Sequence, residues 1–95
     1  MYCVRMSRQS LKDKKLLKQA GLEGKARKLL EVIRTDPWQT PPPYEKLTGD
    51  LQGLYSRRIN IHHRLVYSAD HEEATVEGTV YEGTVVVYRM WSHYE

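Results

Sequence analysis

Residues 54–67 read LYSRRINIHHRLVY, and this stretch decides how the C-terminal half of the chain folds. Two runs of strand-forming residues, 54–59 and 63–68, flank the short segment Asn-Ile-His at 60–62. Two such runs joined by a tight connection predict a β-hairpin. We therefore expect a small sheet to assemble around this hairpin.

The predicted hairpin also brings two positive charges together. Symmetry about Ile61 places Arg58 and Arg64 roughly opposite each other on adjacent strands. Like charges in a cross-strand pair repel unless an anion lies between them. The pairing therefore indicates a phosphate site. Two independently solvated surface arginines are the alternative, because exposed arginines are common.

The N-terminal third of the sequence predicts one strand and two helices. Residues 2–6 form a short apolar run, and Ser7 or Ser10 can cap a helix that begins near Gln9. This first helix is crowded with lysines and offers only a narrow apolar stripe, formed by Leu11, Leu16, Leu17 and Ala20. The second helix has a clearer helical period, formed by Leu22, Ala26, Leu29, Leu30 and Ile33. We expect the second helix to pack on the sheet.

Prolines and acidic residues mark the segments on either side of the hairpin. Asp36-Pro37 ends the second helix, because the residue before a proline is pushed out of the helical region. The prolines at 41–43 predict a stiff, extended linker. Residues 74–91 predict further strand in a long hairpin. Five acidic residues in this region are expected to discourage edge-to-edge pairing of its strands with other molecules. These residues are Asp70, Glu72, Glu73, Glu77 and Glu82.

Together these elements predict an α+β fold. We expect a short N-terminal strand and two helices packed on a twisted, mainly antiparallel sheet, with an extended C-terminal hairpin. At 95 residues the chain is one domain, residues 1–95, with a small core. It cannot hold a cofactor-binding domain plus a substrate domain, so any function must lie on one compact face.

Charge and cysteine content limit which binding partners and which cellular compartment we expect. The net charge of +3 conceals a gradient, because residues 1–34 hold ten of the fifteen Lys and Arg, whereas residues 70–95 hold six acids and one arginine. A basic surface attracts polyanions, although a lysine-rich helix is also commonly a solvated face. The lone Cys3 has no disulfide partner, and no stretch approaches the roughly 20 apolar residues that cross a bilayer. We expect a cytoplasmic protein with no membrane contact.

One set of side chains suits cleavage of an RNA phosphodiester without a metal. Attack by the RNA's own 2′-hydroxyl needs a base for that hydroxyl, an acid for the departing 5′-oxygen and positive charge at the phosphorane. The sequence supplies a carboxylate, three guanidinium groups and an imidazole at Glu45, Arg57, Arg58, Arg64 and His93. The histidines lack cysteines or carboxylates at zinc-ligand spacing. We therefore expect neither a metal nor a cofactor.

From about Pro41 onward the chain resembles the YoeB group of the RelE superfamily of bacterial toxin ribonucleases. That group shows Leu-x-Gly, an aromatic or aliphatic residue, an aromatic residue and Ser-Arg-Arg-Ile, followed by His-Arg-Leu-Val-Tyr and a final His-Tyr. Residues 51–59, 63–67 and 93–94 occupy those places here. The resemblance implies a RelE-like microbial ribonuclease fold.

The resemblance also implies roles for individual residues. The implied general base, phosphate stabiliser and general acid are Glu45, Arg64 and His93, in that order. The implied RNA-binding residues are Arg57, Arg58 and Tyr94. One of the two adjacent arginines could point away from the RNA, because neighbouring strand residues face opposite sides of a sheet. Tyr55 and Tyr67 are expected to be core or semi-core aromatics.

The activity that the resemblance implies is endonucleolytic cleavage of mRNA in the ribosomal A site, which inhibits translation. The implied partners are the ribosome, mRNA and a YefM-like antitoxin whose C-terminal segment wraps the toxin and covers this face. The resemblance further implies a homodimer, and co-repression of the toxin's own operon with operator DNA contacted only through the antitoxin complex.

Three departures from the family pattern bear on these expectations. Thr48 stands where a lysine often lies, which removes one candidate phosphate contact. Trp91-Ser92 replaces the more usual basic-aromatic pair before the final His-Tyr. The acidic hairpin at 70–85 is longer than the family pattern and bears on dimerisation and antitoxin contact. Two rival functions stay open: a non-catalytic RNA- or ribosome-binding module, and an accessory subunit of a repressor complex.

Overall fold

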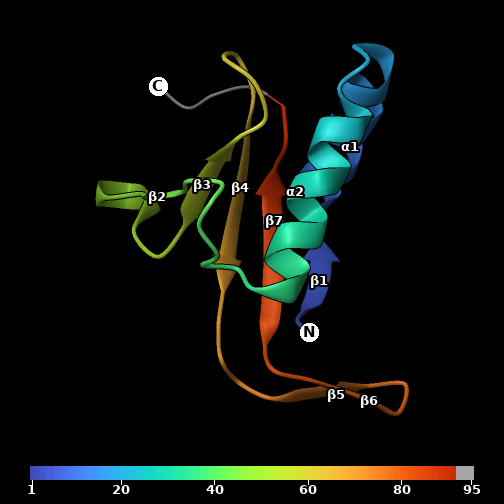
Figure 1. The fold of residues 1–95 in the computed structure, drawn as a ribbon, viewed down its shortest axis with the longest axis vertical. Coiled ribbons are helices and arrows are strands. Elements are labelled where there is room, and N and C mark those ends of the chain that lie inside the picture. Colours follow the sequence, from blue (N-terminus) through green and yellow to red (C-terminus); the bar gives the residue numbers. More distant parts are fainter. Residues whose placement is uncertain (92–95) are drawn as a thin grey trace.

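The computed structural model describes residues 1–91 and contains a five-stranded sheet with the order β1-β7-β4-β3-β2 (Figure 1). Its strands are β1 (Cys3–Met6), β2 (Glu45–Lys46), β3 (Tyr55–Arg58), β4 (Arg64–Ala69) and β7 (Thr84–Arg89). β1 pairs with β7 in parallel, whereas β2 with β3, β3 with β4 and β4 with β7 pair antiparallel. The predicted α+β fold with a mainly antiparallel sheet is confirmed.

Two helices lie against the same side of this sheet, beside β1 and β7 (Figure 1). They are α1 (Arg8–Gln19) and α2 (Glu23–Thr35). The Ser7 side chain caps α1, because its Oγ accepts a hydrogen bond from the Ser10 backbone N–H at 3.0 Å. α2 ends at Thr35 and Asp36 is its extended C-cap residue, in agreement with the prediction that Asp36-Pro37 ends the helix.

The core lies between the helices and the sheet. α2 contributes the stripe that its sequence period predicts, since Ala26, Leu29 and Ile33 are buried. Leu22 and Leu30 are partly buried and pack against the same cluster. The sheet contributes the other half of the core, in particular Leu65, Tyr67, Val85 and Val87.

The apolar stripe predicted for α1 is confirmed only at Leu17, which is fully buried. Leu11 is 50% exposed and Leu16 is 38% exposed. The other buried residues of α1 are Ser10 and Asp13, which are polar. Asp13 can be buried because its Oδ2 accepts hydrogen bonds from Arg89 Nε at 2.9 Å and from the Met90 backbone N–H at 3.0 Å. A carboxylate thus joins α1 to the end of β7, where the sequence favoured apolar contacts.

The first predicted hairpin is present, whereas the separate second hairpin is shorter than the predicted residues 74–91, because β7 joins the five-stranded sheet. In the first, β3 pairs with β4 and Arg58 stands directly opposite Arg64, as predicted. The second is a separate two-stranded sheet of β5 (Ala74–Val76) and β6 (Thr79–Tyr81) that projects from one end of the molecule (Figure 1). The extended linker predicted at the prolines is wrong, because residues 40–42 form bends before β2 and the short 3-10 helix η1 (Gly49–Leu51).

Candidate active site

Three neighbouring strands bring a carboxylate, a hydroxyl and a guanidinium together on one face of the β3–β4 hairpin. Glu45 in β2 pairs with Ser56 in β3, and Arg64 lies in β4. Arg64 Nη1 is 3.6 Å from Glu45 Oε2 and donates a hydrogen bond to Ser56 Oγ at 3.3 Å. We call this the outer face, defined by Glu45, Ser56, Arg58 and Arg64. It unites the predicted base and the predicted phosphate stabiliser, which are 19 positions apart in the sequence.

An open hollow of about 260 Å³ lies on the outer face. Its lining residues are Pro43, Tyr44, Glu45, Ser56, Arg58 and Arg64. Arg58 is exposed and Arg64 has 26% of its side chain exposed, so both guanidinium groups can meet solvent or a ligand. Two cations and one carboxylate leave this hollow with a net positive charge, which favours an anion such as a phosphate.

Arg57 does not belong to this face. Its side chain is 1% exposed, and its guanidinium donates four hydrogen bonds within the protein. The acceptors are Tyr67 Oη at 3.0 Å and the backbone carbonyls of Pro37, Gln39 and Pro42 at 3.0, 2.8 and 2.6 Å. The expectation that Arg57 binds RNA is therefore wrong in this structure. Strand alternation turns Arg57 to the side opposite Arg58, where it fastens the proline-rich loop to the sheet.

Tyr67 is the second member of this buried cluster. It is fully buried, and its hydroxyl donates to the Pro37 carbonyl at 2.6 Å while accepting from Arg57. Burial raises the pKa of the Tyr67 phenol above its ordinary value, and the hydrogen bond from Arg57 opposes that rise in part. Tyr55 is partly buried against the core. The prediction that Tyr55 and Tyr67 are core or semi-core aromatics is confirmed. We call this side of the hairpin the inner face, defined by Tyr55, Arg57, Leu65 and Tyr67.

Two residues near the site were not singled out from the sequence. The Ser56 hydroxyl accepts a hydrogen bond from Arg64 on the outer face. The centroid of the Tyr44 ring lies 5.1 Å from the Arg57 guanidinium carbon, which is within the range of a cation–π interaction. Ser56 could have been found, because it lies two positions before Arg58 and so shares its face of the strand. Tyr44 carries no such signal, since it belongs to an irregular loop whose path the local sequence does not determine.

The remaining predicted site residues, His93 and Tyr94, lie outside the described residues. The structure follows the chain as far as Trp91, two residues before His93. Trp91 stacks on His63, which directly precedes Arg64. The last described residue is therefore in contact with the residue directly before β4, the strand that carries the candidate phosphate stabiliser.

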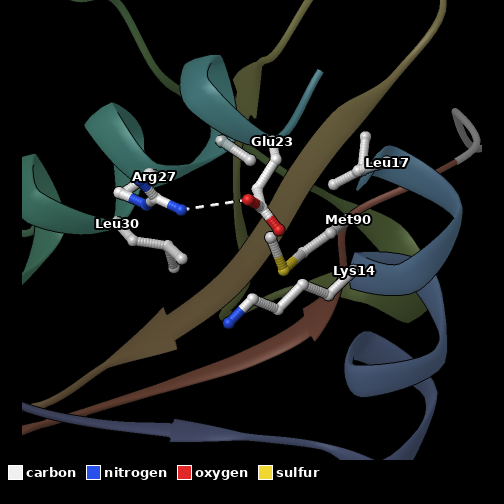
Figure 2. Close-up of a pocket in the computed structure, with 7 residues that line it drawn as sticks. Lys14, Leu17, Glu23, Arg27, Leu30 and Met90 are labelled. Atoms are coloured by element: carbon white, nitrogen blue, oxygen red, sulfur yellow. Dashed lines mark hydrogen bonds and ion pairs between the residues drawn. The ribbon is translucent and has the colours of Figure 1, made fainter. Parts of the chain in front are cut away.

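Other hollows in the described part of the chain differ in character. One of about 500 Å³ lies beside β2 and η1, and Lys46 is the cation among its lining residues. A cavity of about 40 Å³ lies between α1, α2 and Met90, with the ion pair of Glu23 and Arg27 at its rim (Figure 2). The latter has room for a few waters and not for a nucleotide.

Two features are absent from residues 1–91. These residues contain no group of three or more His, Cys, Asp or Glu side chains that could hold a metal ion. In the same part of the chain, neither helix has the length and apolar character needed to span a membrane.

Residues 7–94 match the family model described as the YoeB-like toxin of bacterial type II toxin-antitoxin systems. Among curated proteins, toxin YoeB of Synechocystis sp. is 45% identical over 56 residues. That alignment covers 59% of this chain and 58% of the relative, so the chain matches little more than half the length of that toxin.

Solved structures extend the likeness over nearly the whole chain. The YoeB/ParE toxin from Agrobacterium tumefaciens has a TM-score of 0.79 at 23% sequence identity. The alignment covers 97% of this chain and 99% of that toxin, which shows that the two share a fold. The YoeB dimer from Staphylococcus aureus has a TM-score of 0.73 at 28% identity, with 98% of each chain covered. The heterotetrameric YoeB-YefM complex from the same organism gives a TM-score of 0.71 at 28% identity, with 99% of each chain covered.

Proposed function

The chain belongs to the YoeB-like toxins of bacterial type II toxin-antitoxin systems, and we propose that it is a ribosome-dependent endoribonuclease that cleaves mRNA in the ribosomal A site. Cleavage proceeds through the 2′-hydroxyl of the RNA, needs no metal and stops translation in the cytoplasm. Residues 1–95 act as a single toxin domain. The observation that supports this proposal most directly is the meeting of Glu45 and Arg64 in an open, positively charged hollow.

Glu45 is the general base in this proposal. Its side chain is 65% exposed and lines the hollow, so the 2′-hydroxyl of a bound nucleotide can reach it. The carboxylate takes the hydroxyl proton as the 2′-oxygen attacks the adjacent phosphorus. In the RNA-free protein Glu45 pairs with Arg64 at 3.6 Å. A partly exposed pair of this kind contributes only about 0–1 kcal/mol, so a phosphate can displace the carboxylate from Arg64 at little cost.

Arg64 stabilises the charge that develops on the phosphorane. A guanidinium stays protonated at all physiological pH values and can bind two phosphate oxygens at once. The hydrogen bond to Ser56 Oγ and the pairing of β4 with β3 hold the side chain against the sheet. Arg58, directly opposite, binds a neighbouring phosphate. An RNA backbone lying between the two arginines removes the repulsion that their cross-strand pairing creates.

His93 is the general acid, and Tyr94 contacts a base or a phosphate. An imidazole can carry a transferable proton near neutral pH. It gives that proton to the departing 5′-oxygen, so that the P–O5′ bond breaks and leaves a 2′,3′-cyclic phosphate and a 5′-hydroxyl. A phosphate bound beside the imidazole favours its charged, acidic form.

The proposal is tested with purified protein and ribosomes stalled on a defined mRNA. We expect cleavage at the A-site codon, and a loss of about 10²- to 10⁴-fold in rate for Glu45→Gln and for His93→Gln. Asp50→Asn is the matched control, because Asp50 is an exposed acid near Glu45 that lies outside the hollow. Cleavage at the parental rate by both variants would refute the roles assigned here.

The proposed partners follow from the family. A YefM-like antitoxin binds the toxin and covers the outer face, the toxin itself forms a homodimer, and the toxin-antitoxin complex represses its own operon through DNA contacts of the antitoxin. The S. aureus relative, which has been solved both as a dimer and as a heterotetramer with YefM, supports the first two partners. Copurification with a small partner, followed by recovery of cleavage when that partner is removed, tests the inhibitory role.

Growth assays separate this proposal from a non-catalytic one. The lysine-rich surface of α1 could bind RNA or the ribosome without any chemistry. In that case Glu45→Gln and His93→Gln would arrest growth as strongly as the parent protein. Mapping of mRNA 5′ ends after brief induction should instead give cuts in phase with codons for the parent and none for His93→Gln.

A further inference from the structure

His63 and Trp91 join two parts of the chain that are 28 residues apart. Their rings stack with centroids 4.0 Å apart and planes inclined by 18°. His63 Nδ1 also lies within hydrogen-bonding distance of the Trp91 backbone carbonyl oxygen. A carbonyl can only accept, so the proton of this hydrogen bond belongs to Nδ1. One histidine therefore holds Trp91 both by its ring and by its backbone.

His63 is itself held firmly by the turn between β3 and β4. Its backbone N–H donates to Asn60 Oδ1 at 2.8 Å, and its carbonyl accepts from the backbone N–H groups of Ile59 and Asn60 at 2.9 and 3.2 Å. The next residue is Arg64, the first residue of β4. The ring of His63 is thus fixed relative to the strand that carries the candidate phosphate stabiliser.

The segment just before Trp91 is held from the opposite direction. The carboxylate of Asp13 in α1 is 1% exposed and accepts from Arg89 Nε and from the Met90 backbone N–H at 2.9 and 3.0 Å. Gln9 Nε2 donates to the other oxygen of this carboxylate at 3.0 Å. Residues 89–91 therefore have an anchor on α1 and a second anchor on the β3–β4 turn.

We infer that His63 is a positioning residue for the proposed general acid, because it holds the chain at Trp91, two residues before His93 in the sequence, beside the start of the strand that carries Arg64. This inference rests on the proposed function, in which His93 is the general acid. Proton transfer to the departing oxygen depends on geometry, and a misplacement of about 1 Å can cost about 10²-fold in rate. His63 itself touches neither the RNA nor the reacting atoms.

The inference predicts a specific pattern of rates on stalled ribosomes. His63→Ala should lower the single-turnover cleavage rate about 10- to 100-fold and leave the affinity for the ribosome unchanged. His63→Phe keeps an aromatic ring to stack on Trp91 but loses the hydrogen bond, so its rate should fall between those of His63→Ala and the parent. Ile61→Ala, in the same turn and 80% exposed, is the matched control and should keep the parental rate.

A double-mutant cycle distinguishes positioning from a purely structural role. If His63 acts through His93, the change His63→Ala should have almost no effect on the residual rate of a His93→Gln protein. An equal fold-loss in the parent and in the His93→Gln background would overturn the inference, since the two residues would then act independently. Urea unfolding of each variant identifies any loss of rate that comes from unfolding.

A measurement that needs no cleavage keeps the inference separate from the proposed function. The heteronuclear NOE of the Trp91 indole N–H should fall in His63→Ala, whereas that of Trp38 serves as an internal reference and should not change. An unchanged Trp91 signal would show that His63 does not hold the chain there, whether or not the protein cleaves mRNA. Absence of cleavage by the parent, with the NOE change present, would refute the nuclease proposal and its dependent role for His93 while leaving the His63–Trp91 anchor in place.

Discussion

The inner and outer faces of the β3–β4 hairpin carry adjacent arginines with opposite surroundings. On the inner face, Arg57 is 1% exposed, and its guanidinium donates hydrogen bonds to the Tyr67 hydroxyl and to three backbone carbonyls. On the outer face, Arg58 is exposed and stands opposite Arg64 in an open hollow. The comparison teaches that strand alternation decides which guanidinium stabilises the fold and which can meet a polyanion.

The largest effect should follow from breaking the inner face. Arg57→Met removes the donors to one buried and two partly buried carbonyls. A buried polar group left unsatisfied costs about 1–3 kcal/mol, so we expect the free energy of unfolding to fall by about 3 kcal/mol. Urea denaturation measures the change. Arg58→Met, the matched substitution on the outer face, should stay within about 0.5 kcal/mol of the parent. Equal midpoints for the two variants would erase the distinction between the faces.

The converse substitution tests the outer face. Arg64→Ala should lower the rate of mRNA cleavage about 10²- to 10³-fold, because a guanidinium beside the phosphorane is lost. Its free energy of unfolding should change by no more than about 1 kcal/mol, since the pair with Glu45 is partly exposed. Single-turnover rates and urea midpoints on the same preparation give both numbers. If Arg64→Ala lost much of its stability while each folded molecule still cleaved mRNA at the parental rate, Arg64 would have a structural role and not a catalytic one.

A smaller effect should come from Tyr67→Phe. This change removes the hydroxyl that donates to the Pro37 carbonyl and accepts from Arg57, while the ring stays in the core. The expected loss is about 1–2 kcal/mol in the free energy of unfolding. Thermal and urea unfolding check this value. No loss of stability would mean that the Arg57 network closes equally well without the phenol.

The smallest effect concerns alkaline pH. Burial raises the pKa of Tyr67 in the folded protein above the ordinary value of 10.0, so the folded state keeps the phenol proton more tightly than the unfolded state does. The resulting stability is fully present below pH 10 and is lost as the pH rises through the folded-state pKa. The stability advantage of the parent over Tyr67→Phe should therefore shrink above about pH 10. An advantage that stays constant up to pH 11 would argue against the raised pKa.

Local sequence patterns correctly predicted much of the fold. The period of α2, the cap at Ser7 and the register that pairs Arg58 with Arg64 all depend on neighbours in sequence, and the structure agrees with each. The buried face of α1 could not be predicted, because Asp13 is stabilised by Arg89 and Met90, more than 70 positions away. Hydrophobic periodicity does not report on such distant polar partners.

In the candidate site, too, some features were predicted from the sequence and others depend on contacts between distant segments. The approach of Arg64 to Glu45 agrees with the expected arrangement, whereas the catalytic roles of Glu45, Arg64 and His93 remain predictions. Strand alternation predicted that one of the two adjacent arginines could point away from the RNA. It did not predict that this residue is Arg57 or that it is buried, because its partners are carbonyl oxygens placed by a loop with several prolines. The anchoring of Trp91 by His63 was also not foreseen, since it joins two segments whose proximity only the folded sheet creates.

The parallel pairing of β1 with β7 has a consequence for the protein during its synthesis. Within residues 1–91, β1 pairs with β7, which begins at Thr84 and joins β1 to β4. Contacts between such distant segments form late, after the intervening chain is available. A chain that ends before Thr84 therefore lacks the strand that joins β1 to β4, so an incomplete translation product should not show the proposed activity.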